Sequence, residues 1–351
     1  MPKYKDIIDH LVREIESGKL APGQKLPSEA MVVKRYGTSR ITVGRAMREL
    51  QQRGLIDRVA GSGSYVRNTR MERPLFGLLI PELGETEIFA PICHGIATAR
   101  EGSTHALIWG HSDPEVSAHS EQAMQLCDQY IAQKVSGVFF APLEFEPDAL
   151  EVNRRILRKL AQAKIPVVLL DRRPETAPER NRPDLVGINN RQAGYLATEH
   201  LIQLGCRRVG FLAYHGSALT ISARFAGYSD ALTAHGLTPA APGIGEMQES
   251  GEELEAYVCI NDRLAGQLMH MFLARKIRVP EDIRIVGIDD VSYASLLPVP
   301  LTTVRQPCRE IGAIALSTML DRIQHPHMPS RDVLVDGELI IRHSSGPAVS
   351  E

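Results

Sequence analysis

Residues 38–66 read TSRITVGRAMRELQQRGLIDRVAGSGSYV, and this stretch decides how the first part of the chain folds. Ser39 has a side chain that can cap the start of a helix. Val43, Met47 and Leu50 then fall at positions i, i+4 and i+7, so they can form one buried stripe. Four polar side chains lie off that stripe: Arg40, Thr42, Arg45 and Arg48. The helix can therefore present cations and a hydroxyl group to an anion.

Behind this helix, the sequence predicts a β-ribbon. Residues 55–59 (LIDRV) and 65–66 (YV) have the composition of short strands, and residues 60–64 (AGSGS) form a glycine-containing connection between them. A helix followed by such a ribbon is the arrangement of a winged helix-turn-helix. By residue type alone, the same stretch is also compatible with a basic surface helix beside an ordinary hairpin.

Two further helices are predicted upstream. The apolar residues of segment 4–15 follow helical spacing, and the Ser-Gly pair at 17–18 ends that helix. Ser28 caps a second helix predicted at residues 29–36, which Gly37 closes. The expected order is therefore helix, turn, helix, turn, helix and ribbon.

Charge is divided unevenly along the chain. Residues 1–72 contain 14 Lys and Arg against 8 Asp and Glu, a net charge of +6, so the remainder carries −8 of a total of −2. A basic first part joined to an acidic second part suits a polyanion-binding domain attached to a body of another kind.

Length and composition limit the class of protein. The 351 residues are enough for two or three domains. No apolar run approaches the roughly 18 residues of a membrane span, and the start MPKYKDIIDHL lacks a signal-peptide core, so we expect a cytoplasmic protein with no membrane partner. The cysteines are widely spaced, without a CxxC or Cys/His cluster, which predicts reduced core residues and neither metal nor cofactor. They are Cys93, Cys127, Cys206, Cys259 and Cys308.

The motifs SGKLAPGQKLPSE, SRITVGRAMRELQQRGLI and GSGSYV, in this order, resemble the DNA-binding domain of the GntR family over residues 1–68. The resemblance implies that Ser28 and Glu29 lie near the DNA backbone. It places Ser39, Arg40 and Thr42 in the major groove, where arginine can donate two hydrogen bonds to guanine. The implied wing tip over the minor groove consists of Gly61, Ser62, Gly63 and Ser64.

Arg45 and Arg48 complete the predicted DNA-binding set. Many members of the family carry arginine where this chain has Gly44, so no contact is assigned to Gly44 itself. Because one such domain reads only a few base pairs, we expect a homodimer on a two-fold symmetric operator in double-stranded DNA.

A change of pattern separates this domain from the rest. Residues 67–74 (RNTRMERP) are polar and charged, and we assign residues 69–74 to a linker before a second domain at 75–345. Short apolar runs then alternate with amphipathic segments, which predicts a parallel α/β fold with two sheets. The runs are 75–80, 105–109, 137–141, 166–171, 185–188, 208–213, 256–260 and 283–288.

Several motifs of this second part resemble the effector domain of LacI/GalR repressors, which is similar to periplasmic sugar-binding proteins. They include VSGVFFAPL, INNRQAGYLATEHLIQLGCRRVGFL, SARFAGYSDAL and VPEDIRIVGIDDVSYASLLPVPLTTVRQP. The resemblance implies two doubly wound lobes with a ligand in the cleft between them. The pairing with a GntR-type domain is similar to that of bacterial arabinose-type repressors.

Polar residues follow three of the predicted strands: Asp171, Asn261 and Asp289. Ligands of open parallel sheets bind at the carboxyl ends of the strands, and such side chains can bond sugar hydroxyls. Each could instead be a helix N-cap, and Asp290 is expected to bond locally. The resemblance implies that Arg224 reaches the ligand with Asp171, Asn261 and Asp289 as partners.

Other positions of the second domain are open to two interpretations. Phe89 could stack on a sugar face or belong to the core, and helix 88–99, with Ile92 and Ile96, could form a dimer face or pack on its own sheet. Trp109 and His111 are weaker ligand candidates, and Arg172 and Arg173 are expected to be solvated.

Two features depart from the LacI pattern. Glu85 and Glu87 replace the usual Ser or Asn, so the ligand can differ from common hexoses. The segment 236–261 is short, and its residues 249–255 allow barely two helical turns.

These features predict a ligand-responsive transcriptional regulator, most simply a repressor of sugar-utilisation genes that a sugar releases from its operator. The alternative is an activator or a corepressor-dependent regulator that responds to a non-sugar or acidic-sugar ligand. An enzyme is disfavoured because the chain has no GxGxxG after a first strand, no P-loop and no GxSxG elbow. A transport binding protein would fit the second domain but not the basic first one.

Overall fold

The computed structural model describes the chain except for residues 1–2, 22, 60–61, 67–73, 81–86, 100–104, 111–118, 145, 175–181, 215–218, 240–242, 245–253 and 347–351. It divides into two compact units, Met1–Arg73 and Pro74–Glu351, which are considered separately below. Among the described residues, no helix is both long and apolar enough to cross a bilayer.

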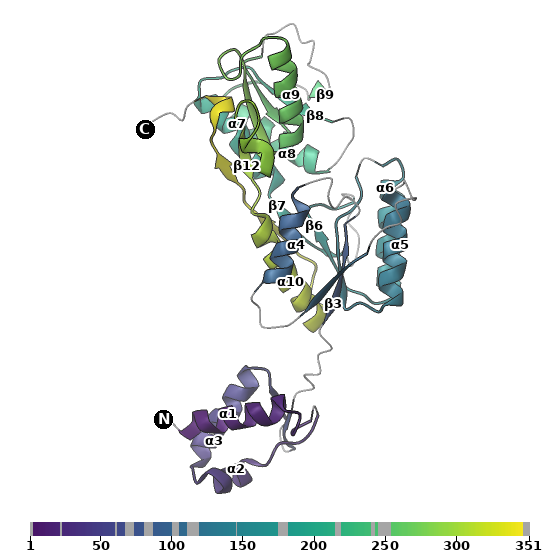
Figure 1. The fold of residues 1–351 in the computed structure, drawn as a ribbon, viewed down its shortest axis with the longest axis vertical. Coiled ribbons are helices and arrows are strands. Elements are labelled where there is room, and N and C mark those ends of the chain that lie inside the picture. The colour runs from purple at the N-terminus through teal and green to yellow at the C-terminus, as the bar shows by residue number, and fades with distance from the viewer. Residues whose placement is uncertain are drawn as a thin grey trace. The chain divides into compact units, whose positions relative to one another are not determined.

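The first unit is a three-helix domain with a β-ribbon (Figure 1). Its elements are α1 (Lys3–Glu16), α2 (Glu29–Tyr36), α3 (Arg40–Gln52), β1 (Ile56–Val59) and β2 (Gly63–Val66). The predicted caps are present, since Ser28 Oγ accepts from Met31 N at 3.3 Å and Ser39 Oγ accepts from Thr42 N at 3.2 Å. Gly37 ends α2 with φ 57°, a conformation that favours glycine.

The buried stripe of α3 is the one that the spacing predicts. Val43, Met47 and Leu50 are each 0% exposed and pack with residues of α1, α2 and the ribbon. The ribbon pairs antiparallel, with Val59 opposite Gly63, so its connection is shorter than the predicted 60–64. The winged helix-turn-helix prediction is confirmed in its elements and their order.

The second unit contains two six-stranded sheets, each belonging to one lobe. In the first lobe the strand order is β13-β7-β6-β5-β3-β4, with all strands parallel. The strands are β3 (Leu75–Leu79), β4 (Ala106–Trp109), β5 (Gly137–Phe140), β6 (Val167–Leu170), β7 (Asp184–Ile188) and β13 (Asp332–Val335). The helices are α4 (Phe89–Thr98), α5 (His119–Ala132), α6 (Ala149–Gln162) and α10 (Cys308–Gln324).

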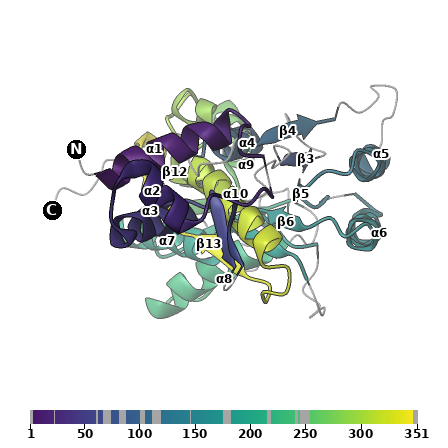
Figure 2. The same ribbon diagram turned by 90° about the horizontal axis from the view of Figure 1, so that it is seen from below.

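Both faces of the first-lobe sheet are covered. Along β5, Phe139 belongs to the core beneath α4 and α10, whereas Val138 and Phe140 belong to the core beneath α5 and α6. Figure 2 shows α5 and α6 together on one side of these strands, with α10 on the other. Two-sided burial explains why the strands are continuous apolar runs in the sequence.

In the second lobe the strand order is β14-β12-β11-β10-β8-β9, and only β14 is antiparallel among the described pairs. The strands are β8 (Val209–Ala213), β9 (Gly243–Ile244), β10 (Ala256–Cys259), β11 (Arg284–Asp289), β12 (Thr302–Arg305) and β14 (Glu338–Ile340). The helices are α7 (Asn190–Gln203), α8 (Leu219–Ala234), α9 (Asp262–Ala274) and the short turns η1 (Ser292–Ser295) and η2 (His343–Ser345).

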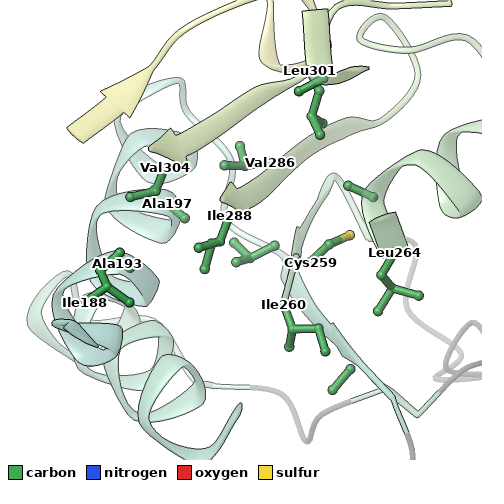
Figure 3. Packing of buried hydrophobic residues seen from close by; sticks show 14 of the residues in the cluster. Ile188, Ala193, Ala197, Cys259, Ile260, Leu264, Val286, Ile288, Leu301 and Val304 are labelled. Carbon is green, nitrogen blue, oxygen red and sulfur yellow. The ribbon is translucent and has the colours of Figure 1, made fainter. Parts of the chain in front are cut away.

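The chain passes between the lobes three times, after β7, after β12 and after β13. Buried apolar residues continue across these crossings as one cluster. Figure 3 shows Ile188, at the end of β7, close to Ala193 and Ala197 of α7, with Val286 and Ile288 of β11 facing them. The two lobes are therefore parts of one packed body, which confirms the predicted two-lobed parallel fold.

The predicted dimer face on helix 88–99 is occupied within the protomer. Ile92 and Ile96 are at most 1% exposed, because α4 packs directly on α10. A Cβ atom added at Gly95 would lie 2.1 Å from the carbonyl oxygen of Arg309, so the two helices touch through their backbones. The alternative interpretation, packing on its own lobe, is correct for these residues.

Candidate functional site

The first candidate surface is the exposed side of α3. Arg40, Arg45 and Arg48 are all exposed there, opposite the buried stripe. The Arg45 guanidinium lies 4.2 Å from the centroid of the Tyr4 ring, so α1 helps to hold it. The hydroxyls of Ser39 and Thr42 bond each other at 2.9 Å, next to the free amide groups at the start of the helix. This end of α3 can bind phosphate through amide groups and contact bases through Arg40.

Among the other predicted DNA-binding residues, some side chains are bonded within the domain. Glu29 accepts from Arg58 of β1 at 2.5 Å, so it joins α2 to the wing. Ser62 bonds the Tyr65 hydroxyl at 2.6 Å. Gly63 and Ser64 lie within β2 rather than in the connecting loop. Gly61 lies outside the described residues.

The second candidate site lies where the two lobes meet. Arg224 of α8 is 7% exposed and is held entirely by second-lobe groups. Its Nε donates to Asn190 Oδ1 at 2.7 Å, its Nη1 donates to the Ile260 carbonyl, and its Nη2 lies 3.6 Å from Asp289 Oδ1. Gln306 Nε2 also donates to Asp289, at 2.7 Å. Asp289 is therefore a partner of Arg224, as the resemblance implies, and Asn190 and Gln306 are additional members that the sequence analysis missed.

The first lobe contributes Asp171, which follows β6. It is 7% exposed, and its Oδ1 has no hydrogen-bond partner within the described part of the chain. Burial raises the pKa of Asp289, and the charge of Asp171 adds to this rise from across the lobe boundary, so the two carboxyl groups lie near each other. A buried acceptor without a donor is the feature expected of a ligand contact.

Arg172 is not solvated, contrary to the prediction. It is 8% exposed, its Nε donates to the Pro142 carbonyl at 2.9 Å, and its Nη1 pairs with Glu144. Its guanidinium also lies 5.7 Å from the centroid of the Phe89 ring, which is itself 1% exposed in the core. The core interpretation thus fits Phe89. Arg173 is also bonded, to Asp332 and to the Pro183 carbonyl.

Asn261 has the alternative role that the sequence left open. Its Oδ1 accepts from Leu264 N at 2.9 Å, which makes it the N-cap of α9, and it does not contact Arg224. Asp290 bonds locally, as expected, to Arg305 at 2.7 Å and Arg342 at 2.6 Å.

Glu85 and His111 lie outside the described residues, and so does the predicted short helix at 249–255 except for its last two residues. Trp109 is 67% exposed at the end of β4.

Three acidic residues at strand ends have backbone conformations that are unusual for side-chain-bearing residues. The φ angles are 66° for Asp171, 132° for Asp289 and 53° for Asp290. Such conformations are costly and concentrate where the surrounding structure uses them. Their position at the carboxyl ends of parallel strands agrees with the expected ligand region.

Direct contacts join the lobes beside this region. Glu87, just before α4, accepts from both the amide and the hydroxyl of Ser292 in η1, at 2.9 and 2.7 Å. Thr220 of α8 donates to Glu144 at 3.5 Å. A cavity of about 320 Å³ is lined by residues of both lobes and of the crossing at 305–310, including Glu87, Asp289 and Gln306. Neither Asp171 nor Arg224 lines this cavity, which lies beside the Arg224–Asp289 group and shares Asp289 and Gln306 with it.

A larger hollow of about 1260 Å³ lies at the amino-terminal ends of strands in the first-lobe sheet, where Pro166 and Pro183 precede β6 and β7. Ligands of open parallel sheets bind at the carboxyl ends of the strands. The region between the lobes, at the carboxyl ends of the strands, is therefore the candidate ligand site.

Burial raises the pKa of two carboxyl groups in this region. Asp262 of α9 is 0% exposed, and burial, together with the nearby Asp289 carboxylate, raises its pKa to about 7. Its oxygens accept from the Thr303 hydroxyl at 2.5 Å and from Val291 N at 3.0 Å. Burial also raises the pKa of Asp289, against the opposing charge of Arg224.

A raised carboxyl pKa makes the stability of this unit depend on pH. The folded state holds the Asp262 proton more tightly than the unfolded state does, so the free energy of unfolding falls as pH rises from about 4 to about 7. We expect a fall of roughly 1–3 kcal/mol, part of which the Asp262→Asn variant should remove. Urea unfolding at several pH values measures it. An unchanged pH profile in the variant would show that Asp262 is not the responsible group.

Close packing of two helices fixes the position of Arg224. A Cβ atom added at Gly194 of α7 would lie 2.0 Å from the Arg224 carbonyl oxygen. We expect Gly194→Ala to force the helices apart, to lower the free energy of unfolding by about 1–3 kcal/mol and to weaken effector binding. Gly266→Ala is the matched control, because its Cβ would meet only the Leu297 side chain at 3.3 Å. Urea unfolding and effector titration of both variants test the prediction, which fails if they behave alike.

Comparison with known proteins identifies both parts of the chain. Residues 3–66 match bacterial regulatory proteins of the gntR family, and residues 198–345 match the periplasmic binding protein-like domain. The arabinose metabolism transcriptional repressor of Geobacillus stearothermophilus is 27% identical over an alignment of 367 positions, which covers 98% of each chain. These matches confirm the two resemblances found in the sequence.

Two solved structures have a similar fold. The transcriptional regulator CelR in complex with cellobiose is 22% identical, with a TM-score of 0.64 over 91% of this chain and 100% of its own. The lac repressor dimer bound to operator and the anti-inducer ONPF is 21% identical, with a TM-score of 0.63 over 79% of this chain and 96% of its own.

Proposed function

We propose that this chain, in which a gntR-type DNA-binding domain precedes a periplasmic-binding-protein-like domain, is a homodimeric transcriptional regulator controlled by a small molecule. Its operator is two-fold symmetric double-stranded DNA, and its effector is a sugar-type ligand bound between the lobes. Bound effector releases the protein from the operator, so that it acts as a repressor of sugar-utilisation genes.

The observation that carries the proposal is the combination of two sites in one chain. One is the capped helix α3 with three exposed arginines, which suits phosphate and base contacts. The other is the interlobe region, where Asp171, with an oxygen that has no partner in the described part of the chain, lies near the Arg224–Asp289 group. A ligand bound there can shift the lobes from a conformation with high affinity for DNA to one with low affinity. The free energy of this shift is limited by the difference in ligand affinity between the two conformations.

The known proteins support the same function. The relative that matches over nearly the whole chain is named a repressor of arabinose metabolism. The two structures of similar fold are titled as a complex with a sugar and as a dimer on its operator. A neutral sugar also suits the charges of the site, since the buried guanidinium groups of Arg172 and Arg224 already face Glu144 and Asp289.

The test begins with selection of a binding site from random DNA duplexes by the full-length protein. We expect a palindromic site and a log–log salt dependence of affinity with a slope of about −0.9 for each phosphate neutralised. A panel of neutral sugars, sugar acids and sugar phosphates is then screened by thermal shift and by release of the selected duplex. A neutral sugar at 100 times its Kd should stabilise the protein by about 2.7 kcal/mol.

Each outcome of this test has a separate meaning. Salt-insensitive binding, or failure to select any duplex, contradicts the DNA-binding function. A ligand that strengthens rather than releases the complex makes the protein corepressor-dependent. A response only to sugar acids or phosphates contradicts the neutral effector.

A further inference from the structure

The reading side of α3 contains one apolar side chain that the fold does not use. Ile41 is 81% exposed in the first turn of the helix, between Arg40 and Thr42. It lies on the side away from Val43 and Met47, which are both 0% exposed. Ile41 gains no burial within this unit, so it is available to a partner that contacts this side of α3.

A second feature of the same surface points to a close partner. Gly44, one turn after Ile41, is in the middle of α3, where glycine is among the least favourable residues. A Cβ atom added there would meet nothing within 4 Å, so no packing contact requires glycine. A glycine at this position leaves the helix backbone open to the close approach of another surface.

The surroundings of Ile41 and Gly44 define the partner chemically. Arg40, Arg45 and Arg48 are exposed on the same part of the helix, and they would repel a basic surface and be desolvated by an apolar one. A duplex satisfies both conditions, because phosphates meet the arginines while the floor of the major groove presents one apolar group, the 5-methyl group of thymine.

We propose that Ile41 contacts the 5-methyl group of a thymine in each operator half-site, and that Gly44 lets the helix backbone approach that base step. The proposal rests on the DNA-binding function proposed above and adds the base that this position reads. It makes Ile41 a specificity-determining residue, whereas Arg40 reads a neighbouring base through hydrogen bonds.

Replacing single thymines by deoxyuridine removes only the methyl group, and this tests the contact directly. Using the selected duplex, each thymine of a half-site is replaced in turn and the affinity of the full-length protein is measured. We expect one position at which the replacement weakens binding about fourfold, the effect of one buried methyl group. At that position the Ile41→Ala variant should bind the thymine and deoxyuridine duplexes equally.

Two further variants keep the test decisive. Met31→Ala removes another exposed apolar side chain, 62% exposed on α2, and should keep the sensitivity to deoxyuridine. Gly44→Ala should raise the melting temperature of the domain while weakening binding to the thymine duplex. If Gly44→Ala binds the operator unchanged, the close approach is wrong.

The possible failures are distinguishable. Wild-type protein that selects no duplex contradicts the proposed function itself. Protein that binds a selected duplex, but shows no thymine at which the deoxyuridine effect disappears in Ile41→Ala, contradicts the contact alone. Because Ile41 is exposed, the alanine variant should fold normally, and circular dichroism checks this.

Discussion

Replacing Arg224 by alanine should abolish the response to the effector while operator binding persists. The guanidinium is buried and contacts Asn190, the Ile260 carbonyl and Asp289, so its loss opens the centre of the second-lobe site. Asp289, which is partly buried, then loses its nearby cation, so its charged form is less stabilised. We expect the free energy of unfolding to fall by about 3–5 kcal/mol.

The measurement combines three readouts on the same sample: the urea midpoint, the thermal shift with the selected sugar, and release of the operator duplex by that sugar. Arg191→Ala is the matched control, because Arg191 pairs with Asp230 on the surface of the same lobe, where an exposed ion pair contributes less than about 1 kcal/mol. Normal release of DNA by the sugar from a folded Arg224→Ala protein would overturn the assignment of the ligand site.

Local signals in the sequence were sufficient for most elements of the fold. Ser28 and Ser39 predicted the starts of α2 and α3, because a cap depends on residues within one turn of itself. The central strands were continuous apolar runs, because both of their faces are buried. Strands β12 and β13 were missed, β13 because it is an edge strand with one exposed face and β12 because it is buried but contains two threonines. In β13 half-buried and exposed residues alternate, and β12 reads TTVR, so neither has an apolar run.

The site could be predicted only in part. Asp171, Arg224 and Asp289 were found because strand ends and the family resemblance mark them. Asn190 follows β7 in the same way, and its place after a strand was a signal that could have found it. Arg172 had no such signal, since its burial depends on Pro142 and Glu144, about 30 residues earlier in the chain. Asn261 was assigned to the ligand although a residue at a strand end can equally start the next helix.

Removing the Arg40 side chain should have the largest effect on operator recognition. The residue is exposed at the start of α3, and within the described part of the chain no ion pair involves it, so its donors are available to a base. A bidentate contact to guanine contributes about 1–3 kcal/mol, and a homodimer makes the contact twice. We therefore expect Arg40→Ala to weaken operator binding by roughly 2–6 kcal/mol.

The comparison of selected and random duplexes decides what kind of contact Arg40 makes. If it reads a base, affinity for random DNA should change little, and the variant should lose the preference for the operator. A phosphate contact would instead weaken binding to both duplexes alike and reduce the salt slope by about one for each contact. Arg53→Ala is the control, because Arg53 pairs with Glu49 at 2.5 Å at the far end of the helix. Equal losses in the two variants would mean that the start of α3 does not face the bases.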